Sequence, residues 1–170
     1  MESLNELLGE IKKLTSRGRT VACPAEPMTI QGITEGAALS TSGDALGLIS
    51  KIAVPLSGII YSATFFDLDD EGTQVDLEIF KRAIADVAWD AAYAPSDAEI
   101  RDFVTELNFV AFDDHGACQT SEIFNIGKAY TAPEGYLWIQ AVTRATPSIA
   151  KGNNPRIQLQ ILSDDPTWSN

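Results

Sequence analysis

Acidic side chains between Asp67 and Glu78 are spaced in the manner of a calcium-binding loop. Acids stand at positions 1, 3, 5 and 12 of this segment, and Gly72 stands at position 6, as in the loop of a helix-loop-helix calcium site. However, position 5 is Glu71, whose side chain is longer than the usual Asp or Asn, and strand-like segments flank the loop where helices are required. We therefore expect a solvated hairpin tip and no bound metal.

The only histidine, His115, follows two acids, Asp113 and Asp114, and precedes Cys118 by three residues. A histidine beside a carboxylate can act as a general base, and Cys118 could pair with it. No Gly-x-Ser-x-Gly segment, glycine-rich phosphate loop, zinc spacing or paired-carboxylate motif accompanies them. The sequence therefore predicts a surface histidine and a buried strand cysteine, with no catalytic residue, no cofactor, no metal site and no enzyme activity.

Aromatic side chains offer a second kind of site, a platform on which sugar rings could stack. The candidates are Trp89, Tyr93, Tyr130, Tyr136 and Trp138. Trp138 lies in an apolar segment and is expected in the core, whereas Trp168, in the polar C-terminal tail, is expected to be exposed. Carbohydrate binding stays open as an alternative function.

The composition favours one folded body without affinity for polyanions. The 170 residues are 45% hydrophobic, which suits a single domain with its own core. Residues 1–20 hold three acids and four bases, so of the net charge of −12 the remaining 150 residues carry −13. This excess of acid argues against nonspecific binding to nucleic acid or to anionic membranes.

Two further features bear on the cellular compartment. Cys23 and Cys118 lie far apart in sequence, so two free thiols are favoured over a single bridge, and neither belongs to a metal-spacing pair. The N-terminus lacks the basic start and apolar run of a signal peptide, and no window reaches the roughly 18 apolar residues of a membrane helix. We expect a soluble protein made in a cytoplasm.

The segment from Ser57 to Lys81 has the most regular pattern in the chain. β-Branched and aromatic residues fill its first half, its second half alternates apolar and polar residues, and Gly72 can adopt the positive φ of a short turn. This pattern predicts a β-hairpin. The predicted core face is Val75, Leu77 and Ile79, and the predicted solvent face is Gln74, Asp76 and Glu78.

Residues 1–43 are predicted to be an appendage of the body. Five apolar residues at helical spacing predict an amphipathic helix over residues 2–14, which can dock on its own body, dock on a neighbouring subunit or stay disordered. Residues 15–43 contain several Gly and Pro residues and lack a period, which predicts an extended arm. The predicted partner-binding residues are Leu4, Leu7, Leu8, Ile11, Leu14, Arg17 and Arg19.

Residues 44–170 are predicted to form an antiparallel β-sandwich or jelly-roll body with a short polar tail. Strands are expected over 45–55, 118–126, 136–143 and 156–162, separated by Gly and Pro turns. Residues 82–94 fit either a loop or a frayed strand. Ser96 and Glu99 form a capping-box pattern ahead of an apolar stripe, which predicts one short inserted helix over residues 97–107. The predicted fold class is all-β.

Several segments of the body resemble virion structural proteins of tailed bacteriophages. These are Phe65 to Gly72 with Val75 to Leu77, Ser121 to Tyr130, Ala132 to Gly135, Leu137 to Ala141, and Pro155 to Ile161. The motifs fall within residues 44–162 and carry no reaction. The resemblance implies a jelly-roll protein of the virion.

The same resemblance implies a head decoration or cement protein, which in such families often forms trimers that bridge capsid subunits. The implied partners are the major capsid protein and further copies of this chain as a homotrimer, with no nucleic acid and no membrane. The implied location is the capsid surface, after synthesis in the host cytoplasm. The alternatives are a carbohydrate-binding or host-recognition module of a phage tail, and a cell-encoded scaffold domain.

Overall fold

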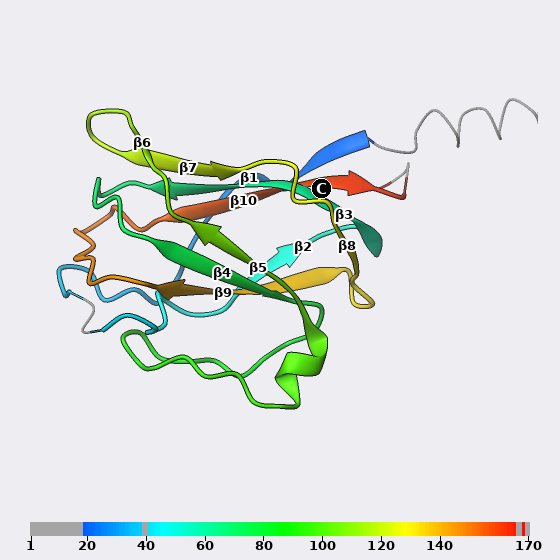
Figure 1. The fold of residues 1–170 in the computed structure, drawn as a ribbon, viewed down its shortest axis with the longest axis horizontal. Helices are drawn as coiled ribbons and strands as arrows, with labels where there is room; N and C mark the ends of the chain where they lie inside the picture. Colours follow the sequence, from blue (N-terminus) through cyan, green and yellow to red (C-terminus); the bar gives the residue numbers. More distant parts are fainter. Residues whose placement is uncertain (1–18, 39–40, 166–167, 169–170) are drawn as a thin grey trace, which may run out of the picture.

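Two antiparallel β-sheets pack face to face and make up almost all of the fold (Figure 1). The computed structural model describes residues 19–38, 41–165 and 168. Within this part of the chain, no helix is long and apolar enough to cross a membrane. The predicted N-terminal helix and the first part of the predicted arm lie outside the described residues.

The strands of each sheet come from distant parts of the chain. The first sheet has the order β1 (Arg19–Thr29), β10 (Arg156–Ser163), β3 (Ser57–Asp67), β7 (Gln119–Ile123) and β6 (Asp113–Asp114), with β8 (Lys128–Thr131) paired to the start of β3. The second has the order β2 (Ser50–Ala53), β9 (Tyr136–Thr143), β4 (Val75–Phe80) and β5 (Phe103–Phe109). The predicted all-β sandwich of antiparallel strands is therefore confirmed.

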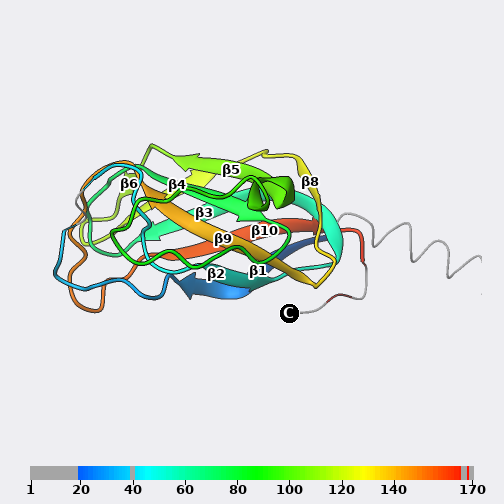
Figure 2. The same cartoon turned by 90° about the horizontal axis from the view of Figure 1, so that it is seen from below.

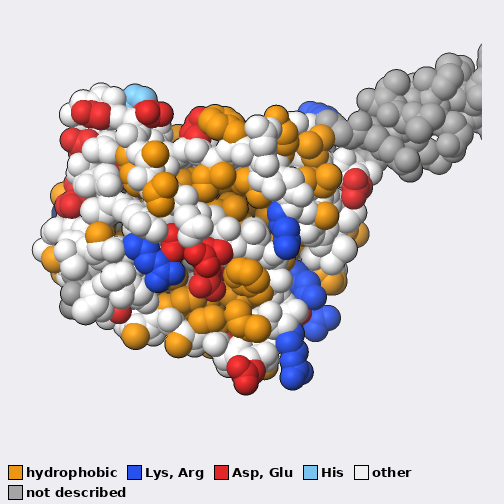
Figure 3. Space-filling view, viewed as in Figure 1, with side chains coloured by type: hydrophobic (Ala, Val, Ile, Leu, Met, Phe, Trp, Pro, Cys, Tyr) orange, Lys and Arg blue, Asp and Glu red, His pale blue; other side chains and the backbone are white. Residues whose placement is uncertain are grey.

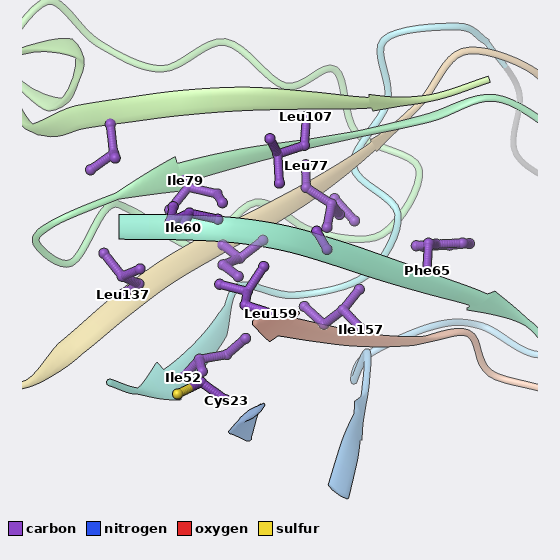
Figure 4. Packing of buried hydrophobic residues seen from close by; sticks show 14 of the residues in the cluster. Cys23, Ile52, Ile60, Phe65, Leu77, Ile79, Leu107, Leu137, Ile157 and Leu159 are labelled. Atoms are coloured by element: carbon purple, nitrogen blue, oxygen red, sulfur yellow. The ribbon is translucent and has the colours of Figure 1, made fainter. Parts of the chain in front are cut away.

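The core lies between the two sheets because each strand turns alternate apolar side chains inward. Ile60 and Leu159 from the first sheet face Leu77, Ile79 and Leu137 from the second (Figure 4), and all five are completely buried. Removing each such side chain from water contributes about 1.5–3 kcal/mol. The core face predicted for β4, Val75, Leu77 and Ile79, is confirmed.

β3 and β4 do not form the predicted hairpin. β3 pairs with β10, β7 and β8, whereas β4 pairs with β5 and β9 in the other sheet. The connecting segment thus crosses from one sheet to the other, and Gly72 takes the expected positive φ, of 59°. Crossing lets the apolar faces of β3 and β4 pack on each other, whereas a hairpin would place both in one sheet and leave that face to another element.

Part of the predicted arm is a strand of the body. β1 pairs with β10 from Arg19 to Thr29, Cys23 is completely buried, and Ile30 just after the strand is 1% exposed. Residues 19–30 therefore belong to the first sheet and its core, so the fold does not divide at residue 43.

β1 is an edge strand with an interrupted ladder. The register shifts between Cys23 and Met28, a stretch that contains Pro24 and Pro27. The side-chain amide of Gln158 donates to the carbonyl oxygens of Pro24 at 3.0 Å and Ala25 at 2.9 Å. Gln158 therefore supplies, from its side chain, hydrogen bonds that the backbone of β10 does not make there.

The helix predicted over residues 97–107 is wrong. The hydrogen bonds expected of a capping box form, since the hydroxyl and N–H of Ser96 both donate to Glu99, but only a single 3-10 turn follows, η1 (Glu99–Asp102), with Ala98 at its N-cap position. The chain then continues as β5, where Leu107 pairs opposite Leu77 and is buried with Phe109. Burial between the sheets overrides the local helix signal, because only an extended chain can continue the ladder beside β4.

The outer face of the second sheet is covered by the segment between β4 and η1, residues 81–98, which is a loop (Figure 2). Phe80 and Gln140 point to this outer face, yet both are completely buried. The Phe80 ring packs edge-on against Phe103 at 5.5 Å, and Tyr93 from the loop reaches β4. Both faces of β4 are thus largely buried. In an ordinary two-layer sandwich, one face of each strand packs on the core and the other is open to solvent.

Candidate functional site

The acidic segment that resembles a calcium loop ties together one end of the sandwich. Asp67, at the end of β3, is 5% exposed, and its carboxylate accepts hydrogen bonds from the N–H groups of Asp69 at 3.1 Å and Gly72 at 2.7 Å. Asp69 in turn accepts from the N–H of Ala150 at 2.6 Å and the amide of Asn153 at 2.8 Å. The predicted solvated tip is therefore wrong for these two acids.

The next two acids also contact neighbouring segments. Asp70 accepts from the Gln119 amide at 2.9 Å, and Glu71 accepts from the N–H of Ser148 at 3.2 Å. Among the described residues, no group of three or more His, Cys, Asp or Glu side chains is placed to hold a metal ion. The carboxylates instead hold the loop before β10 and the start of β7 against the crossing between β3 and β4.

These contacts predict a loop held by hydrogen bonds without calcium. We expect EDTA and millimolar calcium to leave the melting temperature unchanged, whereas Asp69→Ala should lower the free energy of unfolding by about 1–3 kcal/mol, since two donors lose their acceptor. Thermal and urea unfolding check both statements, with Glu134→Ala at an exposed position as the matched control. A rise in melting temperature with calcium that Asp69→Ala abolishes would mean that the loop binds the ion.

His115 lies in the exposed turn between β6 and β7, and among the described residues its side-chain hydrogen-bond partner is a hydroxyl and not a carboxylate. Its Nε2 atom is 2.9 Å from the Thr120 hydroxyl, while the Asp114 carboxylate accepts from the N–H of Gly116. The backbone N–H of His115 donates to the carbonyl of Cys118, which closes the turn. Cys118 is half-buried just before β7, and both cysteines are free. Burial raises the pKa of the Cys23 thiol to about 12 and so keeps it protonated and unreactive.

The aromatic residues do not form a common open platform. The Lys51 ammonium lies 3.7 Å from the ring centre of Tyr136 and 4.9 Å from that of Trp138, so the cation occupies the ring faces. Trp138, expected in the core, is half-buried on the outer face of β9. Trp168, expected to be exposed, is instead half-buried against the core.

A row of charged residues lies on the outer face of β4 and β5, where Figure 3 shows acids gathered near the centre of the view. Glu78 stands directly opposite Glu106, and its carboxylate accepts a hydrogen bond from the Tyr93 hydroxyl at 3.1 Å. Asp76 is 2% exposed and forms an ion pair with Arg144. The predicted solvent face is correct for Gln74, which is exposed, but wrong for Asp76 and Glu78, because Asp76 pairs with Arg144 and Glu78 is bonded by Tyr93 of the covering loop. No local sequence signal reveals these contacts.

The two carboxyls of this row respond differently to their surroundings. Burial raises the pKa of Glu78, and the neighbouring charge of Glu106 adds to the rise, while the Tyr93 hydrogen bond opposes it. Burial also acts to raise the pKa of Asp76, but hydrogen bonds from Asn108 and Arg144 and the Arg144 charge outweigh it, so this pKa is lowered. Asp76 therefore stays charged, whereas Glu78 is the carboxyl that the fold favours protonated.

Glu78→Gln is expected to raise the free energy of unfolding at pH 7 by about 0.2–1 kcal/mol, the usual cost of like charges opposite each other in a sheet. The Gln amide oxygen still accepts from Tyr93, so only the charge is lost. Because the folded pKa of Glu78 lies above the unfolded value of about 4.3, the wild type gains stability as pH falls through the folded pKa. The variant should lack this gain.

Urea unfolding of wild type and variant between pH 7 and pH 4 measures this difference, with Glu134→Gln as the exposed control. A lower stability of Glu78→Gln at pH 7 would show that the charge itself is needed and would contradict this assignment.

Exposed apolar side chains gather on the outer face of the first sheet. Ile59 and Tyr61 on β3 are 37% and 40% exposed, and Phe124, just after β7, is 63% exposed. Leu162 on β10 pairs opposite Ile59 and is half-buried. We call these four residues the Ile59 patch. Single exposed apolar residues are ordinary, but a group on adjacent strands is typical of an interaction surface.

The patch lies at the end of the sheet where the described chain begins. Arg19, the only predicted partner-binding residue within the described part, is exposed at the start of β1 and pairs with Ser163. The next residue, Thr20, pairs with Leu162, which pairs with Ile59. The other predicted partner-binding residues, Leu4, Leu7, Leu8, Ile11, Leu14 and Arg17, lie outside the described residues.

A small cavity lies beside the acidic crossing, lined in part by Phe65, Asp67, Pro147 and Ile149. Its volume of about 10 Å³ is room for about one water molecule. Organic ligands require several hundred Å³. This cavity therefore does not suit a small-molecule substrate, and the Ile59 patch is the surface best suited to binding.

Neither the models of known protein families nor the curated proteins contain a match to this chain.

Proposed function

We propose that this chain is a non-enzymatic virion structural protein, a capsid decoration or cement protein of a tailed phage. In this proposal it has a jelly-roll topology, binds the shell of the major capsid protein and acts as a homotrimer on the capsid surface. The resemblance of the strand segments to phage virion proteins motivates the assignment. The two-sheet antiparallel architecture supports it, because jelly rolls are built in this way.

The observation that carries the proposal is the contrast between the two outer faces of the sandwich. One is covered by residues 81–98, whereas the other exposes the Ile59 patch. A cement protein needs a rigid body that presents a surface to neighbouring subunits, and it needs no reaction chemistry. The charge of −13 over residues 21–170 supports the proposal as well, since net charge keeps a protein soluble before assembly.

Quantitative mass spectrometry of purified virions tests the location. A copy number in simple proportion to the major capsid protein is the expected result. A copy number equal to that of tail components would instead favour the host-recognition alternative, and absence from the virion would refute both.

Binding to the shell is tested with heads that lack this protein. Added full-length protein should sediment with the heads, saturate at a fixed ratio to the capsid subunits and raise the temperature at which the heads disrupt. Tyr136→Ala is a suitable comparison, because it alters the aromatic group under Lys51 without touching the Ile59 patch. Selective loss of head binding in that variant would move the shell contact to the second sheet.

A further inference from the structure

The Ile59 patch has no cover within the described part of the chain, although the opposite sheet has one. Ile59 and Tyr61 come from β3, Leu162 pairs opposite Ile59 on β10, and Phe124 directly follows β7, the strand on the other side of β3. Alternate residues of β3 and β10 are buried, and the other exposed large apolar side chains, Leu48, Leu56, Ile100, Phe103 and Val110, lie outside these two strands. What covers this patch must therefore come from the rest of the chain, from another copy or from a partner.

The sequence before β1 contains apolar residues suited to contact an apolar patch. The spacing of five residues there predicts an apolar stripe, and all five lie outside the described residues: Leu4, Leu7, Leu8, Ile11 and Leu14. A helix of that length is marginal in water unless its apolar side is covered.

The distances allow the stripe to meet a patch of this kind. Thr20, Leu162 and Ile59 lie on three adjacent strands, so about 10 Å separates Thr20 from Ile59 at roughly 4.8 Å per strand. Four residues, 15–18, join the stripe to β1 and span at most about 14 Å. Residues 15–18 are therefore long enough to let a segment before β1 reach a patch at this end of the sheet.

The direction of β1 favours docking of the preceding segment on the patch of another copy over docking on the patch of its own chain. β1 runs from this end of the sheet inward, so a chain that continues its line backwards leaves the body beyond Arg19. Returning to its own patch would require a reversal within four residues. An outgoing stripe that meets the patch of the next copy requires none, and because stripe and patch are different surfaces, such contacts can close into a ring.

We propose that the apolar stripe of residues 4–14 docks on the Ile59 patch of a neighbouring copy and thereby forms the trimer. This inference rests on the proposed homotrimer and names its interface. The docked segment is the amphipathic stretch of another copy of this chain. Its leucine and isoleucine side chains pack on Ile59, Tyr61, Leu162 and Phe124.

Mixed disulfide formation tests the contact directly. Two full-length chains, each with Cys118→Ser, are prepared separately, one with Leu8→Cys and the other with Ile59→Cys, and then mixed and oxidised. A disulfide-linked dimer is expected only in the mixture. The matched control replaces Ile59→Cys with Thr64→Cys, further along β3 on the same outer face, which should give little product.

Light scattering supplies the second measurement. Ile59→Asp should fall from trimer to monomer with an unchanged melting temperature of the body, whereas Thr64→Asp should remain a trimer. The inference is overturned if Ile59→Asp stays trimeric, or if the disulfide forms within one chain carrying both cysteines but not between mixed chains. A protein that trimerises through this contact yet fails to bind heads would refute the proposed function alone.

Discussion

Deletion of residues 1–43 is expected to unfold the body, whereas deletion of residues 1–18 is expected to leave it folded. The longer deletion removes β1 with the buried side chains of Cys23 and Ile30 and exposes the edge of β10. Losing several buried side chains and an eleven-residue strand exceeds the net stability of a typical domain, about 5–15 kcal/mol. The shorter deletion stops before the first residue of β1.

Circular dichroism and urea unfolding of the two deletion variants measure this contrast. The 19–170 variant should retain a β spectrum and a cooperative transition close to that of the full chain. A cooperative, equally stable 44–170 variant would show that β1 is dispensable and that the arm predicted from the sequence is a true appendage.

Leu77→Ala is expected to lower the free energy of unfolding by about 2–4 kcal/mol. Leu77 is completely buried, with Leu107 opposite it on one side and Ala141 on the other, so truncation leaves a cavity between strands fixed by two ladders. Val110→Ala is the matched control, since Val110 is 64% exposed at the end of the neighbouring strand. Equal stability of the two variants in urea would contradict the assignment of β4 to the core.

The opposite face of the same strand is expected to matter as well. Asp76→Ala should cost about 1–3 kcal/mol, because Arg144 loses the carboxylate with which it is paired. Since the folded pKa of Asp76 is lowered, its contribution is present above the unfolded value of about 3.9 and is lost as pH falls through the folded pKa. Wild type and variant should therefore converge in stability below about pH 4.

The sequence predicts best the strands whose apolar residues by themselves mark the bounds of the strand. The apolar run of residues 136–143 coincides with β9, and the alternation of residues 156–162 coincides with β10 to within one residue. Period-two alternation reports which face of a strand is buried, whatever its partner. The same principle correctly placed Leu77 and Ile79 in the core.

Pairing partners are not encoded locally, and the wrong predictions share this cause. Nothing near Gly72 distinguishes a hairpin from a crossing between sheets, because the turn chemistry is the same and the choice depends on β10, more than 80 residues away. The Ser96–Glu99 hydrogen bonds expected from the sequence do form, yet the chain pairs with β4 after one 3-10 turn and so no longer helix follows. The charged row around Glu78 was missed because Glu106 and Tyr93 meet it only in the folded chain.

The interrupted ladder of β1 has a consequence for behaviour at high concentration. An edge strand with a full row of free N–H and C=O groups invites a second chain to extend the sheet and aggregate. Pro24 and Pro27 lack N–H groups, and the register shift between Cys23 and Met28 disturbs the alignment that an added strand would need. The first sheet thus resists growth through its β1 edge, so at this edge association through side-chain surfaces is favoured over extension of the sheet into fibrils.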